Sequence, residues 1–200
     1  MIVLVMILAL ILGLFYGMSG AELPPLNVII ENKDIVLYVL MFSVGISIGM
    51  QKGIFSKIKE YHVKIFIIPI GVIIGSILGG FICSLILKMP IGYGTAIASG
   101  LGWYSLAGVT LSELATAEIG SIAFMSNLMR EMFSFMIIPF LAIHFNHYTC
   151  IAPAGATSED TTLPIILKYT NEETVVLSVF NGVICSFMVP ILISFFINIM

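Results

Sequence analysis

Residues 152–164 read Ala152-Pro153-Ala154-Gly155-Ala156-Thr157-Ser158-Glu159-Asp160-Thr161-Thr162-Leu163-Pro164. The stretch combines prolines near both ends, a glycine, four hydroxyl side chains and two adjacent carboxylates. Such residues also form ordinary turns outside a membrane. Within a membrane, irregular backbone is tolerated only where it is buried in protein or lines a cavity. The interpretation of this stretch therefore depends on the class of protein to which it belongs.

The composition indicates that class. Of the 200 residues, 60% are hydrophobic and 10% are charged, whereas about 25% of the residues in a soluble globular protein are charged. The mean hydropathy is +1.15. Because a soluble fold of this size cannot enclose so much apolar surface, we predict an integral membrane protein. The net charge of −3, with only eight Lys and Arg residues, provides no basic surface, and we expect no nucleic-acid partner.

A transmembrane helix needs about 20 mostly apolar residues. Six runs are candidates, at residues 2–18, 35–50, 65–87, 91–111, 120–145 and 174–199. Residues 150–168 form a further segment that either crosses the membrane or is re-entrant. The glycines of residues 91–111 allow either close packing of backbones or a break in the helix. We predict an all-α integral membrane protein with six to seven transmembrane helices, at least one of them broken or re-entrant near the midplane, forming a single transmembrane transporter domain over residues 1–200.

Positive charge predicts the orientation. The first apolar run lacks the positively charged region that precedes the apolar part of a signal peptide, so we predict that it is a retained span. Half of the Lys and Arg residues lie in residues 51–64, and the positive-inside rule places this loop in the cytoplasm. Its apolar residues recur at helical spacing, which is typical of an amphipathic helix on the membrane surface. The N-terminus is then cytoplasmic, and the side of the C-terminus depends on whether residues 150–168 cross.

Polar side chains interrupt the span at residues 120–145. Asn127, Arg130, Glu131 and Ser134 are three or four residues apart along this span, so they share one helix face. An ionisable group near the bilayer centre costs at least about 2.5–3.5 kcal/mol and is a functional hypothesis by default. We therefore predict that this stripe faces the protein interior or a water-filled cavity. In the alternative interpretation, Arg130 and Glu131 only neutralise charges on neighbouring helices.

The stripe and the stretch at residues 152–164 together suggest a ligand. Secondary transporters use broken helices and carboxylates to hold substrates and ions. A site of Glu131, Asp160 and Arg130 carries a net charge of −1, which complements a substrate with two positive groups and one carboxylate. Glu131 or Asp160 would receive the side-chain ammonium, and Arg130 or the N-terminus of a half-helix would receive the carboxylate. Because burial disfavours the charged form of a carboxylate, these residues could also carry protons.

Other signals are weaker. Cys83, Cys150 and Cys185 have no CxxC spacing, so we expect packing residues rather than disulfides or metal ligands. Trp103 and Tyr104 could stack on a cation, and aromatic packing is the alternative. The sequence contains no HExxH, Walker or GxSxG motif. For this chain by itself we therefore expect neither an ATP-driven pump nor an enzyme, with no cofactor and no metal site.

Three stretches occur together in a specific order. Residues 98–108 include Gly100-Leu101-Gly102-Trp103-Tyr104-Ser105, residues 120–131 end in Asn127-Leu128-Met129-Arg130-Glu131, and residues 154–164 end in Leu163-Pro164. In this order and spacing they resemble the bacterial lysine exporter family, LysO-type, and the resemblance covers essentially all 200 residues. It implies export of L-lysine, and of toxic lysine analogues, across the cytoplasmic (inner) membrane of a bacterium with an opposing proton flux.

The resemblance also implies site residues. The intramembrane acidic residues of the family match Glu131 and Asp160, the two carboxylates that their predicted depth in the membrane also singles out. The residues predicted to bind substrate or couple protons are Glu131, Asp160, Arg130, Asn127, Glu159 and Ser158. Glu159 departs from the family pattern, because a neutral residue is expected there, and this leaves open which acid holds the substrate.

The length of the chain is a second departure. Members of the family are longer, and this chain resembles their C-terminal two-thirds. A separate small membrane protein would supply the remaining part, or the chain would work as a homodimer. One alternative function is a non-transporting membrane subunit that pairs with a separately encoded N-terminal half. Another is an exporter or antiporter of a different small cation.

Overall fold

The computed structural model describes residues 2–20 and 64–199, and between them only Pro24, Pro25, Asn32, Ile35, Val39, Phe42 and Ile46. The elements in this part of the chain are all helices, with no strand among them. The prediction of an all-α protein is therefore confirmed for the described residues. Backbone contacts divide the chain into two units, Met1–Gln51 and Lys52–Met200.

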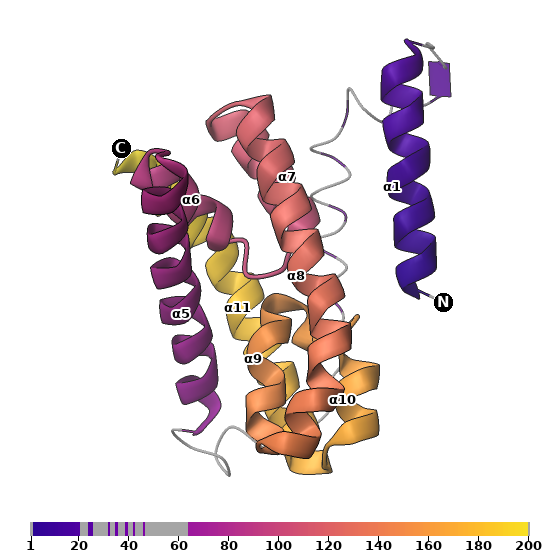
Figure 1. The fold of residues 1–200 in the computed structure, drawn as a ribbon, viewed down its shortest axis with the longest axis vertical. Coiled ribbons are helices and arrows are strands. Elements are labelled where there is room, and N and C mark those ends of the chain that lie inside the picture. The colour runs from indigo at the N-terminus through magenta and orange to yellow at the C-terminus, as the bar shows by residue number, and fades with distance from the viewer. Residues whose placement is uncertain are drawn as a thin grey trace. The chain divides into compact units, whose positions relative to one another are not determined.

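The first unit contains helix α1, Ile2–Ser19, which coincides with the predicted span at residues 2–18 (Figure 1). The helix ends where Gly20 adopts a φ of +62°, a left-handed conformation that commonly terminates helices. Apart from isolated positions, the predicted span at residues 35–50 and the predicted cytoplasmic loop at residues 51–64 lie outside the described residues.

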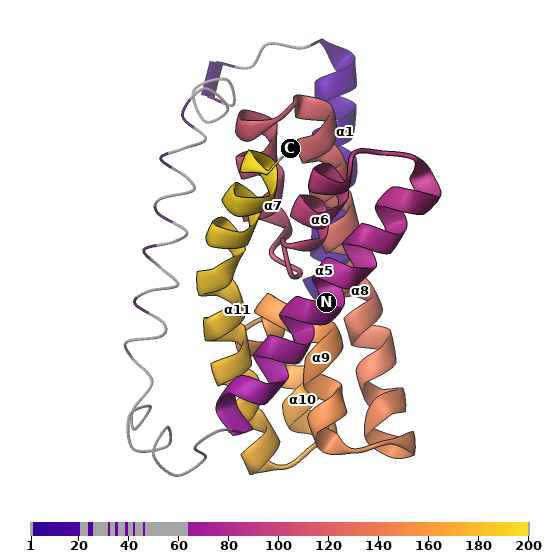
Figure 2. The ribbon, with the colours of Figure 1, turned by 90° about the vertical axis from the view of Figure 1, so that its left-hand side faces the viewer.

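The second unit contains three long helices, α5 (Lys64–Leu87), α8 (Ala117–His144) and α11 (Glu172–Asn198). Each is long and apolar enough to cross a membrane. Their bounds lie within three residues of the spans predicted at residues 65–87, 120–145 and 174–199. Helix α8 runs in the opposite direction to α5 and α11 (Figures 1 and 2).

Polar caps set the start of α8 and α11. The side chain of Thr116 accepts the backbone N–H of Ile119, and that of Asn171 accepts the backbone N–H of Thr174. The first N–H groups of a helix have no partner within the helix, so such side chains stabilise its first turn. These caps explain why α8 and α11 begin two or three residues before the apolar runs themselves.

The predicted span at residues 91–111 is divided into two helices. Helix α6 covers Ile91–Ala98 and helix α7 covers Tyr104–Leu114. We call residues 99–103 between them the first break. Leu101 and Gly102 have positive φ angles of +49° and +100° there, which a continuing helix does not allow. The structure therefore contains the break. It also contains close packing of backbones, because a Cβ atom on Gly94 would lie only 2.8 Å from the carbonyl oxygen of Gly80.

The segment after α8 is also divided. It consists of η1 (His147–Cys150), α9 (Ile151–Ala154), η2 (Gly155–Glu159) and α10 (Leu163–Tyr169). We call residues 155–162 the second break. Its first four residues are all buried, whereas an ordinary turn outside a membrane is exposed. The middle of the stretch at residues 152–164 is thus inside the protein, whereas Ala152, Asp160 and Pro164 are exposed.

The two breaks contact one another. The backbone N–H of Ala156 donates a hydrogen bond of 2.8 Å to the carbonyl of Leu101. A Cβ atom on Gly102 would lie 3.2 Å from the carbonyl oxygen of Ala154, and one on Gly155 would overlap the carbonyl of Leu101. Only glycine permits this approach, because any side chain would separate the two backbones. The contact lies at mid-height between α8 and α11 (Figure 1).

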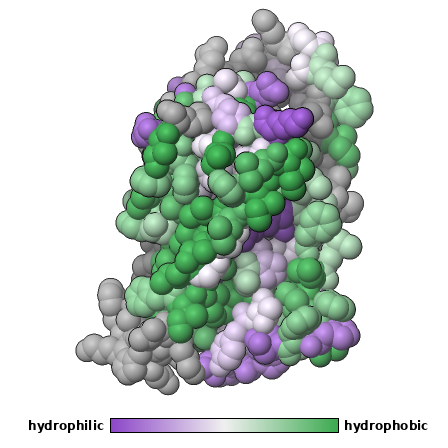
Figure 3. Space-filling view, turned by 60° about the vertical axis from the view of Figure 1, so that its left-hand side comes forward, coloured by the Kyte–Doolittle hydropathy of each residue, from purple (hydrophilic) through white to green (hydrophobic). Residues whose placement is uncertain are grey.

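Helix α5 presents an apolar surface. Ile67, Ile70, Ile74 and Leu78 are each more than half exposed. Figure 3, which brings the left side of Figure 1 forward, shows apolar side chains gathered over this face. An apolar surface of this extent is unusual on a soluble monomer and marks contact with lipid or another protein. It agrees with the assignment of α5 as a candidate membrane span.

Candidate functional site

The predicted polar stripe of α8 faces the protein interior. Asn127, Glu131 and Ser134 are buried, and Arg130 is half-buried. The hydroxyl of Ser134 donates to the carbonyl of Arg130 at 2.8 Å, so its hydrogen bond stays within the helix. The other three side chains form hydrogen bonds with residues outside α8.

Glu131 and Asp160 meet at one hydroxyl group, and we call these two residues the acidic pair. Thr161 Oγ1 donates a hydrogen bond to Glu131 Oε1 and lies 3.3 Å from Asp160 Oδ1. Asp160 Oδ1 also accepts the backbone N–H of Thr161. Glu131 is completely buried, whereas Asp160 is exposed. The structure therefore joins the two predicted carboxylates from α8 and from the second break.

The second oxygen of Glu131 has no hydrogen-bond partner in the part of the chain that the structure describes. Glu131 Oε2 is buried and accepts no hydrogen bond from these residues. An unsatisfied buried polar group costs about 1–3 kcal/mol, and a charged group costs more. A proton on the carboxyl group, or a cationic N–H donor placed beside it, would remove this cost. The acidic pair is thus suited to bind a primary ammonium group or a proton.

Tyr104 borders the acidic pair at the start of α7. It interacts electrostatically with both Glu131 and Asp160. Its ring meets the ring of Phe124 edge to face, with centroids 5.4 Å apart and planes at 88°. Tyr104 therefore makes the aromatic packing contact that the sequence offered as one alternative.

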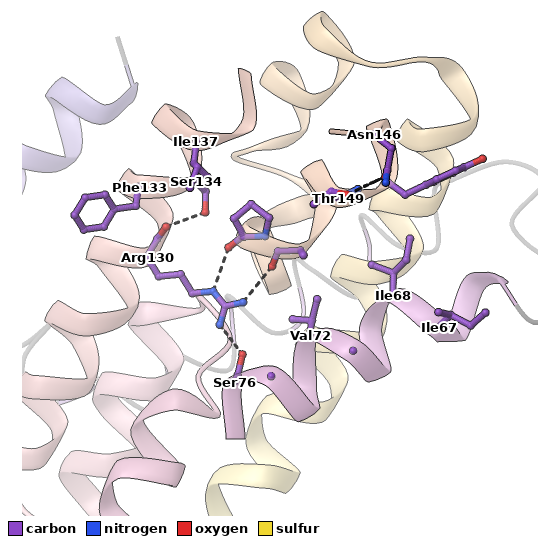
Figure 4. Close-up of a pocket in the computed structure, with 15 residues that line it drawn as sticks. Ile67, Ile68, Val72, Ser76, Arg130, Phe133, Ser134, Ile137, Asn146 and Thr149 are labelled. Carbon is purple, nitrogen blue, oxygen red and sulfur yellow. Dashed lines mark hydrogen bonds between the residues drawn. The ribbon is translucent and has the colours of Figure 1, made fainter. Parts of the chain in front are cut away.

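Arg130 points toward Ser76 of α5 and the start of α9 (Figure 4). Its guanidinium donates hydrogen bonds to the carbonyls of Pro153 and Ala152, at 3.1 and 3.3 Å, and to Ser76 Oγ at 2.8 Å. All three acceptors are neutral oxygens. The side chain also borders an open groove of about 850 Å³ between α5 and α8. Arg130 thus caps the carbonyls of α9, and these hydrogen bonds neutralise neither acid.

Asn127 holds the first break. Its Oδ1 accepts the backbone N–H of Gly102 at 2.8 Å, and its Nδ2 donates to the carbonyls of Ile97 and Ala123, both at 2.9 Å. Both N–H groups of the side-chain amide and its oxygen are therefore engaged by backbone. This engagement gives Asn127 a positioning role in the structure described.

Ser158 holds the second break against α11. Its Oγ lies 2.8 Å from the carbonyls of Gly155 and Ser178, and the hydroxyl of Ser178 donates back to the carbonyl of Ser158 at 2.6 Å. Asn181 Nδ2 donates to the carbonyl of Gly155 at 2.8 Å and to Ser158 Oγ at 2.9 Å. These four residues form a buried polar network between the second break and α11.

Glu159 faces α11, unlike the residue that follows it. Its Oε1 accepts a hydrogen bond of 3.1 Å from Ser186 Oγ. A Cβ atom on Gly182 would lie only 2.5 Å from the Cβ of Glu159, so glycine at this position lets α11 pack directly against Glu159. The adjacent carboxylates of Glu159 and Asp160 therefore have different hydrogen-bond partners.

Sequence reasoning missed three contributors to the site. Thr161 joins the acidic pair, and its only sequence signal is a hydroxyl directly after Asp160. Asn181 and Ser178 hold the second break from within α11. An asparagine in an otherwise apolar helix is a signal of such a role, because its amide needs partners that lipid cannot supply.

A sequence model of the family described as lysine exporter LysO matches residues 7–197. The chain belongs to the lysine exporter LysO family. A protein of Escherichia coli (strain K12) named lysine exporter LysO is 37% identical over 186 residues, which are 93% of this chain and 61% of that protein. A putative lysine exporter of Haemophilus influenzae is 38% identical over 163 residues, which are 80% of this chain and 82% of that protein. No solved structure matches the chain.

Membership of the LysO family confirms the resemblance seen in the sequence. The description of the family names an exporter, and the three apolar helices agree with a membrane protein. The chain spans 61% of the length of the E. coli relative. Within this LysO-family chain, the acidic pair lies beside the two breaks, and Asn127, Arg130 and Ser158 bond to the backbone around them.

Proposed function

We propose that this chain is a secondary transporter that exports L-lysine across the cytoplasmic (inner) membrane of a bacterium in exchange for protons. The observation that carries the proposal is the position of Glu131. Its Oε2 is buried without a hydrogen-bond partner among the described residues, while its Oε1 shares the Thr161 hydroxyl with Asp160. Secondary transporters bind substrates at broken helices of this kind. Both relatives bear names that specify lysine export.

The acidic pair is suited to the side-chain ammonium of lysine. An ammonium has three N–H donors, and hydrogen bonds between such donors and carboxylates are shorter and stronger than neutral ones. Glu131 Oε2 offers an unused acceptor. Because Asp160 is exposed and Glu131 is buried, the ammonium would meet Asp160 first and then Glu131.

The carboxylate of lysine needs a positive partner. Arg130 already donates to two carbonyls and to Ser76, which favours a positioning role for it. Helix α7 begins at the first break, and the N-terminus of a helix attracts anions. We therefore assign the lysine carboxylate to the start of α7, near Tyr104.

The membrane arrangement follows from the apolar runs. Helices α5, α8 and α11 cross the bilayer, and residues 91–114 and 147–169 form the broken segments near its midplane. With the spans that the sequence predicts at residues 2–18 and 35–50, this makes five crossing helices and two broken segments in one domain. Because α8 runs opposite to α5 and α11, each broken segment would return to the side of the membrane from which it starts. The lysine-rich residues 51–64 lie in the cytoplasm.

Efflux of labelled lysine from loaded bacteria tests the proposal. Cells that express this chain should release lysine faster than cells with an empty vector. Glu131→Gln and Asp160→Asn should reduce efflux to the vector level at equal amounts of protein in the membrane. Glu172→Gln is the matched control, because Glu172 is an exposed acid at the start of α11. Normal efflux from both site variants would show that the acidic pair does not bind the substrate.

A second set of outcomes tests the partners. If the chain reaches the membrane and gives no efflux alone, co-expression with a small membrane protein should restore efflux, or cross-linking should reveal a homodimer. Failure of every combination to move lysine would favour a non-transporting subunit or another small cation as substrate. Protection of the same cells against a toxic lysine analogue tests the wider substrate range.

A further inference from the structure

The second break carries two adjacent carboxylates that have different partners. Asp160 bonds to Thr161, whose hydroxyl also bonds to Glu131 of α8. Glu159 instead bonds to Ser186 of α11. The proposed lysine site uses Asp160 and Glu131 and leaves Glu159 without a function.

Packing holds Glu159 close to α11. A Cβ atom on Gly182 would lie 2.5 Å from the Cβ of Glu159 and 2.7 Å from its backbone nitrogen. The preceding residue, Ser158, is bonded to Ser178 and Asn181 of the same helix. The backbone of Glu159 is therefore held beside Ser186 by contacts that do not involve its carboxylate.

The groups around Glu159 do not neutralise it. Asp160, next in the chain, adds a like charge. Cys185 of α11 is a buried thiol. Arg130 of α8 interacts with Cys185, while its hydrogen bonds go to Ser76 and to carbonyls of α9. The hydrogen bond from the Ser186 hydroxyl is thus the one favourable contact to this carboxylate that we find among the described residues.

A partly buried carboxylate with one neutral donor and a like charge beside it favours its protonated form. We propose that Glu159 and Ser186 form a proton site that is separate from the lysine site and that couples the two fluxes. This inference rests on the proposed function, because it specifies which residue exchanges the proton.

Electrostatic repulsion supplies the coupling. An ionised Glu159 next to Asp160 strengthens the attraction of the acidic pair for the lysine ammonium, whereas a protonated Glu159 weakens it. Linkage is reciprocal, so bound lysine must lower the proton affinity of Glu159 by the same factor. Lysine at the acidic pair and a proton on Glu159 then weaken each other's binding, although they bind to different carboxylates. Competition of this kind is what exchange of one cation for the other requires.

Proteoliposomes that contain the full chain separate the two sites. In one assay, external labelled lysine exchanges with internal lysine without a pH gradient. In the other, a pH gradient drives net accumulation of lysine. Glu159→Gln should keep exchange within about threefold of the wild type and lose at least about tenfold in gradient-driven accumulation, because only coupling is removed. Glu131→Gln should lose both activities, and Glu172→Gln should keep both.

Three outcomes would overturn the inference. Full gradient-driven accumulation by Glu159→Gln would show that another group carries the proton. Loss of exchange by a folded Glu159→Gln would place Glu159 in the lysine site. Accumulation that depends on a sodium gradient, tested with choline in place of sodium, would make the coupling ion a different cation.

An infrared titration tests the proton site independently of lysine. The wild-type chain should show carbonyl bands of protonated carboxyl groups that disappear as pH rises, and the band that belongs to Glu159 should be missing from Glu159→Gln. Unchanged bands in Glu159→Gln would overturn the inference. If the wild type shows the band but no lysine exchange, the proposed function fails while the proton site stands.

Discussion

Asn127 and Asn181 hold the two breaks in the same manner, one from α8 and the other from α11. Asn127 Nδ2 donates to the carbonyl of Ile97 at 2.9 Å, just before the first break, and Asn181 Nδ2 donates to the carbonyl of Gly155 at 2.8 Å, where the second break begins. Both asparagines are buried within long apolar helices. Because a break leaves backbone groups without helical partners, each unbroken helix supplies an amide that bonds to them.

Removal of the Asn127 amide should destabilise the protein. In Asn127→Ala the buried N–H of Gly102 loses its partner, whereas the carbonyl of Ile97 keeps the N–H of Gly100. At about 1–3 kcal/mol for one unsatisfied buried group, we expect a loss of about 1–3 kcal/mol in the free energy of unfolding. Thermal unfolding in detergent measures this loss. Ser126→Ala is the control, since Ser126 is exposed beside it. Equal stability of the two variants would mean that the first break does not need the amide.

Glycine at position 155 should be essential for folding. Gly155 has a φ of +58°, and an added Cβ atom would overlap the carbonyl of Leu101. Gly155→Ala should therefore give little monodisperse protein in detergent, because both the conformation and the contact oppose a side chain. Gly79→Ala on α5, where an added Cβ atom meets nothing within 4 Å, should purify like the wild type. A well-folded Gly155→Ala would contradict the described contact of the two breaks.

The hydroxyl of Thr161 should matter for transport more than its methyl group. Thr161→Val keeps the shape of the side chain and removes the donor to Glu131 Oε1. With no donor to orient that carboxylate, we expect lysine transport to fall by at least about tenfold, roughly the effect of one lost hydrogen bond to a charged group. Thr161→Ser restores the donor and should recover most of the activity. Equal rates for the two variants would show that the hydroxyl has no part in the site.

Arg130 should affect assembly rather than lysine affinity. In Arg130→Gln the carbonyls of Ala152 and Pro153 lose a charged donor, so we expect less folded protein and a lower unfolding temperature. Lysine affinity of the folded fraction should stay within about threefold of the wild type. A large loss of affinity at normal stability would instead place the guanidinium on the substrate carboxylate.

Ser186 should tune the pH response of transport. Its hydroxyl stabilises the ionised form of Glu159 by donating a hydrogen bond to it. Without this donor, Glu159 keeps its proton to higher pH, and protonated Glu159 weakens lysine binding. The pH at which lysine affinity is half-maximal should therefore move upward in Ser186→Ala. A downward shift would contradict the proposed site, and Ser194→Ala, farther along α11, should cause no shift.

The long helices could be predicted because the membrane constrains them locally. A spanning segment must satisfy its backbone within itself and must be apolar over a set length, so the runs at residues 65–87, 120–145 and 174–199 suffice to identify α5, α8 and α11. The same reasoning selected Glu131 and Asp160, because ionisable groups at that depth are too costly to be incidental. Their joint contact with Thr161 agrees with that selection.

Local sequence could not decide whether the run at residues 91–111 forms one helix or two. Its glycines allowed either close packing or a break, and the outcome depends on groups that are distant in sequence. The first break forms because Asn127 bonds to Ile97 and Gly102 and because Ala156 bonds to Leu101. Asn127 belongs to α8 and Ala156 belongs to the second break, so both partners are distant from residues 91–111 in the sequence.

Composition and the lengths of apolar runs suffice to predict an all-helical membrane protein, because neither depends on how helices pack, and the three motif stretches point to the LysO family. The contacts of each polar side chain depend on the tertiary structure. In the tertiary structure, Glu159 and Asp160 have different hydrogen-bond partners, and Arg130 donates to the carbonyls of α9. Asn127 and Ser158 form hydrogen bonds that hold the two breaks. A buried polar group needs a partner, and for Asn127, Ser158 and Glu159 at least one partner comes from an element that is distant in the sequence.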